Sequence, residues 1–166
     1  MGTVGIQTHC IFMTPDLMSA STSMAHWVIV LVTVLLVGLS VGLHYEALER
    51  LNDWLPRWKL PVRQRVLFLI FSILLVHTLE IWIFGIGIYG VLLHPPLGHI
   101  EGQPAINLLD AVYLSASCFT TSGDSGLIGR GPLRLIMGTE ALTGFVLITW
   151  SASFTYLEMQ RYWRPR

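Results

Sequence analysis

Charged residues are scarce in this sequence. Only 12% of its 166 residues are charged, 53% are hydrophobic, and the mean hydropathy is +0.62. Soluble globular domains carry about twice that share of charge, roughly 25%. The shortage excludes an ordinary water-soluble domain, and it predicts an all-α membrane protein whose surroundings are the lipid bilayer.

An excess of positive charge is also missing. Ten Lys and Arg residues balance ten Asp and Glu residues, and no basic stripe is interleaved with aromatic residues. We therefore expect no nucleic-acid partner. Only two cysteines occur, Cys10 and Cys118, and neither lies at a metal-binding spacing from other ligand residues. The sequence thus lacks the pattern of a disulfide framework or of a zinc site.

Signatures of catalysis are absent as well. Ser122 and Ser125 lie beside Asp124, but no histidine stands at a spacing typical of a proton relay. His94 and His99 flank two prolines, without a third ligand that would fix a metal geometry. We expect no enzyme, no cofactor, no small-molecule substrate and no metal ion other than permeant cations.

Three apolar runs reach the length of a membrane crossing. The run 27–43 has no charged residue, and the runs 66–93 and 135–157 are interrupted by few ionisable residues. About 20 apolar residues in a helix cross the hydrocarbon core of a bilayer. We therefore expect membrane-spanning helices at 25–45, 66–93 and 133–160.

The placement of basic residues predicts the orientation. Lysine and arginine are absent before the first run, concentrated between residues 50 and 65, and present again at the C-terminus. Because cytoplasmic loops retain these residues, we expect segment 1–24 outside, and the linker 46–65 and the C-terminus in the cytoplasm. The linker is amphipathic and is predicted to form a short interfacial helix that ends at Pro56. Segment 1–24 lacks the positive start and the apolar core of a signal peptide.

The connection between the second and third runs is the most informative segment. Its apolar part, 106–119, is too short to cross the bilayer, and Asn107 or Asp110 could cap a helix there. Gly123 and Gly126 follow, and glycine adopts positive φ at little cost. We expect a short helix that enters the membrane and a non-helical return, which must line a cavity or be buried in protein. The carboxyl end of that helix and the hydroxyls after it would face a dehydrated cation.

Specific residues in this region match a known family. They are the Asp-Ala-Val-Tyr-Leu-Ser block at 110–115, the pair Thr120 and Thr121, Gly123, and the Glu-Ala-Leu-Thr-Gly stretch at 140–144. On these residues the region 66–163 resembles the pore-loop cation channels with two helices around each filter, specifically the small bacterial potassium-channel-like proteins. The resemblance implies an outer helix, a re-entrant pore helix with its filter, and an inner helix, in four copies around one axis.

The resemblance also assigns parts to a pore module at 66–166. The outer helix would be 66–93, the pore helix and filter 106–126, and the inner helix 133–160. The protein would form a homotetramer in a bacterial inner membrane and would pass monovalent cations. The ion filter so implied consists of Thr120, Thr121, Ser122, Gly123, Asp124 and Ser125.

This filter departs from the family pattern Thr-Thr-X-Gly-Tyr-Gly-Asp. Asp124 stands in place of the tyrosine, and Ser125 in place of the second glycine. Family members with an aspartate here are similar to non-selective cation channels, so the resemblance implies a pore for K⁺ and also for Na⁺. A ring of aspartates would concentrate cations and repel anions. The alternative is a non-conducting accessory subunit of a larger membrane complex.

Three ionisable residues interrupt the second and third runs, and such groups need partners inside a membrane. His77 and Glu80 are three residues apart, so they share a helix face and can pair. Either the pair senses pH, since histidine titrates near neutral pH, or it is a polar contact between the second and third helices. Glu140 is expected to meet a hydroxyl of the short helix, from Ser115, Ser117 or Thr121.

Gly144 has two open interpretations. It lies where the family often places a glycine that bends the inner helix. It could equally permit close helix packing, together with the other small residues Ala141 and Gly138. The two roles are compatible, and we carry Gly144 forward as the candidate hinge.

Overall fold

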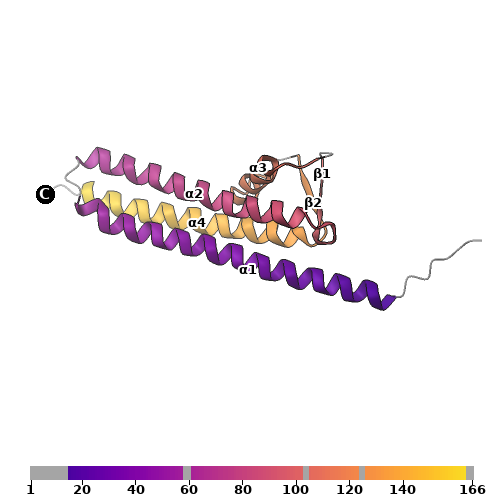
Figure 1. Ribbon diagram of the computed structural model, residues 1–166. Coiled ribbons are helices and arrows are strands. Elements are labelled where there is room, and N and C mark those ends of the chain that lie inside the picture. The colour runs from indigo at the N-terminus through magenta and orange to yellow at the C-terminus, as the bar shows by residue number, and fades with distance from the viewer. Residues whose placement is uncertain (1–14, 58–60, 103–104, 124–125, 164–166) are drawn as a thin grey trace, which may run out of the picture.

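The computed structural model describes residues 15–57, 61–102, 105–123 and 126–163. Three of its helices are long and apolar enough to cross a membrane, which confirms the expected number of spans. They lie side by side in one elongated bundle, with consecutive long helices running in opposite directions (Figure 1). These long helices are α1 (Pro15–Trp54), α2 (Val62–Leu92) and α4 (Leu133–Trp163).

The first helix differs from the sequence prediction. We expected a helix at 25–45 and a separate interfacial helix within 46–65, but α1 continues unbroken to Trp54 and ends in a 3₁₀ turn, η1 (Leu55–Arg57). No proline occurs between Pro15, the first residue of α1, and Pro56, so no proline forces a break. The extra turns also have a packing role, because Leu48 and Leu55 are buried there.

Two apolar clusters hold the long helices together. At the end of the bundle where α1 ends and α2 begins, Leu48 and Leu55 pack with Leu69 and Ile73 of α2. The larger cluster joins Ile29 and Leu36 of α1 to buried residues of α2, α3 and α4, which are Phe84, Ile88, Val91, Ala111, Leu114, Leu133 and Ile136. The face of α1 between these clusters is polar, since Ser40 and His44 are buried on it.

A short helix, α3 (Leu108–Phe119), lies between α2 and α4 in the sequence and packs against both. It begins with a reciprocal cap: the Asp110 amide donates to Asn107 Oδ1, and the Asn107 amide donates to Asp110 Oδ2, each at 2.9 Å. Both residues proposed from the sequence as caps therefore act together. Ala111, Leu114 and Phe119 are buried, whereas Leu109 and Tyr113 are more than half exposed.

Three contacts define the course of α3 along α2. Val112 lies against Gly85, the Ser115 hydroxyl donates to the carbonyl of Ile81 at 2.8 Å, and the ring of Phe119 packs on the ring of His77. As the chain advances along α3, its partners recede along α2. The helix thus starts beside the C-terminal part of α2 and ends beside the middle of α2.

A small sheet ties the two flanks of α3 together. Strand β1 (His99–Glu101) pairs antiparallel with β2 (Ile128–Arg130), with Ile100 opposite Gly129. The side chains of Arg130 and Glu101 form an exposed ion pair at 2.9 Å. Strand β1 precedes α3, and β2 follows the loop after it. Their pairing therefore joins the two ends of the segment that contains α3, at one end of the bundle (Figure 1). The sequence analysis did not predict these strands.

Candidate functional site

The loop after α3 folds back on the end of that helix. The amide of Thr121 donates to the carbonyl of Cys118 at 2.9 Å, and the amides of Ser122 and Gly123 donate to the carbonyl of Ser117 at 3.1 and 3.3 Å. This pattern is a Schellman-type helix end, which needs a left-handed residue just past the helix. Thr121 holds that conformation with φ 55°, although a β-branched residue rarely adopts it.

The same loop is open to its surroundings. Thr120, Thr121, Ser122 and Gly123 are all exposed in the single chain, although Phe119 just before them is buried. Their amides donate into α3, and the Thr120 hydroxyl donates to the carbonyl of Ala116 at 2.7 Å. Asp124 and Ser125, the other two predicted filter residues, lie outside the described residues. The described part of the loop is therefore a polar, oxygen-rich turn next to a buried helix end.

Helix α4 holds α3 in place through a glycine. A Cβ atom on Gly144 would lie 2.2 Å from the carbonyl oxygen of Phe119, so only glycine fits this backbone contact. The packing role considered for Gly144 is thus present, and its role as a hinge stays a prediction. Around Gly138 a Cβ atom would meet nothing within 4 Å, so that second glycine serves no such contact.

A polar contact joins the same helices one turn earlier. The hydroxyl of Ser115 is hydrogen-bonded to Glu140 Oε1, as well as to the carbonyl of Ile81. Of the three hydroxyl partners expected for Glu140, the structure selects Ser115. Glu140 is fully buried, and its Oε2 has no hydrogen-bond partner among the described residues. The contact links α2, α3 and α4 at one level of the bundle.

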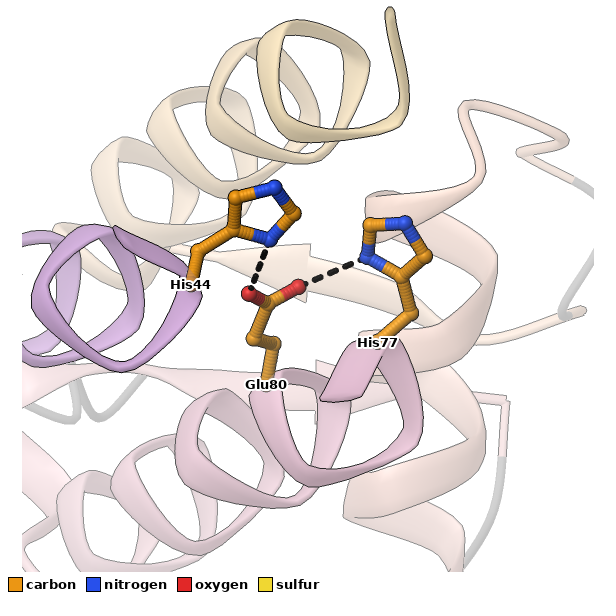
Figure 2. A group of neighbouring side chains, drawn as sticks. All are labelled: His44, His77 and Glu80. Carbon is orange, nitrogen blue, oxygen red and sulfur yellow. Dashed lines mark hydrogen bonds and ion pairs between the residues drawn. The ribbon is translucent and has the colours of Figure 1, made fainter. Parts of the chain in front are cut away.

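Next to this level lies a cluster of two histidines and one glutamate, which we call the histidine–glutamate cluster: His44, His77 and Glu80 (Figure 2). The Nδ1 atom of His44 is 2.9 Å from Glu80 Oε1, and the Nδ1 atom of His77 is 2.8 Å from Glu80 Oε2. His44 comes from α1, whereas His77 and Glu80 come from α2. One carboxylate thus bridges two imidazoles, each bound to a different oxygen.

The cluster is largely sealed from solvent. His44 and Glu80 are 0% exposed, and the side chain of His77 is 14% exposed. Ser151 of α4 places its hydroxyl 3.3 Å from His44 Nε2, and the ring of Trp150 lies against His44 with centroids 5.3 Å apart. All three long helices therefore contribute to the cluster.

A pocket opens beside the exposed edge of His77. Its volume is about 440 Å³, and Ser151 lies on its wall together with His77. The other lining residues are mostly apolar and come from α2 and α4. The exposed edge of His77 therefore faces the groove between these two helices.

The charge balance of the cluster is unusual. The three apolar runs of the sequence contain no Lys or Arg, and in the described part of the chain the ion-pair partners of the Glu80 carboxylate are the two imidazoles. An uncompensated carboxylate inside a bilayer is costly. The arrangement therefore suits a bound positive charge, carried either by a proton on an imidazole or by a metal ion.

Two of the three residues of this cluster, His77 and Glu80, were predicted from the sequence. The hydrogen bond between His77 and Glu80 that their spacing predicts is present, and the proposed role of this pair in sensing pH stays a prediction. His44 was missed, although it lies within the helix expected at 25–45, because it follows the apolar run 27–43 and was not considered among the ionisable residues of the spans. A signal was available: Ser40 and His44 lie four residues apart, so they share a face of an otherwise apolar helix.

Comparison of the chain with protein-family models, curated proteins and solved structures found no match. The resemblance to pore-loop channels therefore depends on the residues quoted above, and the functional argument depends on the geometry of the chain itself.

Proposed function

We propose that this chain is the pore-forming subunit of a homotetrameric channel for monovalent cations, with the loop 120–125 as its ion filter. The observation that carries the proposal is the course of α3, which starts near one end of the bundle and ends beside His77 in the middle of α2. A single loop cannot enclose a pathway for ions. Four copies around one axis would bring four such loops together.

The depth of the loop supports this role. Phe119, the residue before the loop, touches Gly144, which lies about three turns or 17 Å from the start of α4 at about 1.5 Å per residue. A bilayer has a hydrocarbon core about 30 Å thick. A loop at this level of a membrane-spanning bundle falls near the bilayer centre, where non-helical backbone is tolerated only inside protein or along a water-filled cavity.

The polarity of the loop also fits a cation. The carboxyl end of a helix carries a partial negative charge, and α3 directs that end toward Thr120. The amides of Thr121, Ser122 and Gly123 donate back into α3. Oxygen atoms are then the groups that the loop can offer to an ion in place of its water shell. In a tetramer, the four Asp124 carboxylates would add negative charge to the proposed filter.

The faces next to the loop provide a surface for further copies. On α3 these are Leu109 and Tyr113, which are 65% and 56% exposed. On α4, Leu142 and Phe145 are 64% and 58% exposed. Since lipid is as apolar as these side chains, exposure alone does not require a partner. Their position beside an exposed polar loop favours packing against neighbouring copies, which would remove the loop from lipid.

Ion flux into proteoliposomes tests the proposal. Purified protein is reconstituted, and uptake of K⁺, Na⁺ and Cl⁻ is measured for the wild type and for Asp124→Asn. We expect K⁺ and Na⁺ uptake, no Cl⁻ uptake, and lower or less cation-selective uptake in the variant. Glu101→Gln is the matched control, since it removes a carboxylate from the paired strands at the end of the bundle. It should leave selectivity unchanged.

The oligomeric state separates the channel from the accessory subunit. A tetramer in detergent, measured by light scattering coupled to gel filtration, supports the pore. A monomer or dimer together with no flux for any ion would favour the non-conducting subunit and contradict the proposal.

A further inference from the structure

We propose that His44, His77 and Glu80 bind one divalent transition-metal ion, with Zn²⁺ as the probe, at the point where the three long helices meet. This site is separate from the ion filter and does not depend on the proposed channel function. The spacing in the sequence predicted the pairing of His77 with Glu80 but not the third ligand, because His44 lies on α1 and the other two lie on α2.

The ligand set is the first argument. Two imidazoles and one carboxylate are a familiar three-ligand set for Zn²⁺, which leaves a fourth position for water or another small ligand. The candidate ligand atoms, one from each residue, all lie within 4.8 Å of one another. Imidazole nitrogen also favours zinc and its neighbours over Mg²⁺ or Ca²⁺, which prefer oxygen.

The spacing of the atoms is the second argument. His44 Nδ1 and His77 Nδ1 lie 2.9 and 2.8 Å from the Glu80 carboxylate. Ligands in a tetrahedral zinc site, with bonds of about 2.0–2.1 Å, are about 3.4 Å apart. The nitrogen–oxygen distances would thus have to lengthen by about 0.5 Å. The three ligand atoms, which lie within 4.8 Å of one another, would also have to reach this common spacing around the ion.

The surroundings supply the support that bound metals require. A histidine that binds a metal through one ring nitrogen usually donates its other ring N–H to a nearby oxygen that does not bind the metal. With Nδ1 of His44 on the metal, its Nε2–H would face the Ser151 hydroxyl, which lies 3.3 Å away. The pocket of about 440 Å³ beside His77 leaves room for the fourth ligand.

Charge balance is the third argument. Among the described residues, the ion-pair partners of Glu80 are His44 and His77, with no Lys or Arg. A divalent cation bound to the cluster would compensate the Glu80 carboxylate, which is costly to leave uncompensated at membrane depth.

Metal titration of the full chain tests the site. The protein is purified with a tag that contains no histidine, stripped with EDTA, and titrated with Zn²⁺, and bound zinc is measured by plasma mass spectrometry. We expect one tightly bound Zn²⁺ per chain. His44→Gln and His77→Gln should each weaken binding by at least the 10–100-fold typical of outer-shell changes, and Ser151→Ala by about 10-fold.

The matched control is the double variant His94→Gln and His99→Gln, which removes two exposed histidines outside the cluster and should bind as the wild type does. Binding that is unchanged in His44→Gln, or absent in the wild type, overturns the proposal. If the cluster variants do not fold, X-ray absorption at the zinc edge of the wild type decides. Two imidazoles in the first shell support the site, and a shell without them contradicts it. Ion flux is not a readout here, so failure of this site and failure of the channel are distinguishable.

Discussion

The ring of Phe119, the last residue of α3, packs against the imidazole of His77 with ring centroids 5.7 Å apart. His77 belongs to the histidine–glutamate cluster, and Phe119 precedes the loop that carries Thr120 and Thr121. One aromatic contact therefore separates the buried polar centre of the bundle from the candidate ion filter. A change at His77 has a direct physical route to the filter through this ring.

Gly144 should tolerate no side chain. In Gly144→Ala the new Cβ would meet the carbonyl of Phe119 at 2.2 Å, so α3 must move or the helices must separate. We expect a loss of about 1–3 kcal/mol in the free energy of unfolding, the usual cost of overpacking. Titration of SDS into mixed micelles measures it. Gly138→Ala, with open space around its Cβ, should be neutral or slightly stabilising, and equal losses in both variants would contradict the packing role.

Thr121 should be replaceable by glycine with a gain in stability. Its φ of 55° is unfavourable for a β-branched residue, and glycine removes a cost of roughly 1–2 kcal/mol. Thr121→Gly also deletes a hydroxyl proposed for the filter, so its ion selectivity should fall while its unfolding midpoint rises. In Thr120→Gly, where φ is −82°, no strain is relieved and the midpoint should fall. A lower midpoint for both variants would rule out the left-handed turn.

Ser115 should be needed to satisfy Glu140. Its hydroxyl bonds both to the Glu140 carboxylate and to the carbonyl of Ile81. Ser115→Ala leaves the buried Glu140 carboxyl without this hydrogen bond, which costs about 1–3 kcal/mol. The control is Ser153→Ala, where the lost hydroxyl is exposed and bonds only to the carbonyl of Thr149 in its own helix. Thermal unfolding in detergent compares the two, and a control that loses as much stability as Ser115→Ala would refute the assignment.

The reciprocal cap between Asn107 and Asp110 should stabilise the first turn of α3. Asn107→Ala removes one side of the reciprocal cap with Asp110 and should destabilise the protein by about 0.5–2 kcal/mol. Asn52→Ala, on an exposed position inside α1, should have little effect. Hydrogen exchange of the amides in the first turn of α3 is the sharper readout, since faster exchange confined to that turn is the expected signature.

Much of this architecture follows from local sequence. The three spans, the cap at Asn107, the end of α3 before Thr120 and the pairing of His77 with Glu80 all depend on residues within a turn or two of each other. Hydropathy and spacing report such relationships directly. Ser115 was one of the three partners predicted for Glu140, because the short helix and the third long helix had both been recognised from the sequence.

The relationships that were missed connect distant segments. His44 meets Glu80 and Ser151 only because α1 packs in one register against α2 and α4, and apolar runs carry no information about that register. The extension of α1 past residue 45 was missed because the charged residues that follow were interpreted as the end of the helix. These residues mark only where the helix leaves the hydrocarbon layer of the membrane. The β1–β2 pair is too short for any alternation to predict it.

Cross-linking at the loop tests most directly whether four copies face a common axis. In a background with Cys10 and Cys118 replaced by serine, Ser122→Cys is oxidised in reconstituted membranes, with Leu75→Cys on an exposed face of α2 as the control. The account predicts disulfide-linked dimers within a tetramer for Ser122→Cys and none for Leu75→Cys. Efficient cross-linking of Leu75→Cys with none at Ser122→Cys would contradict the central claim that these loops meet around one pore.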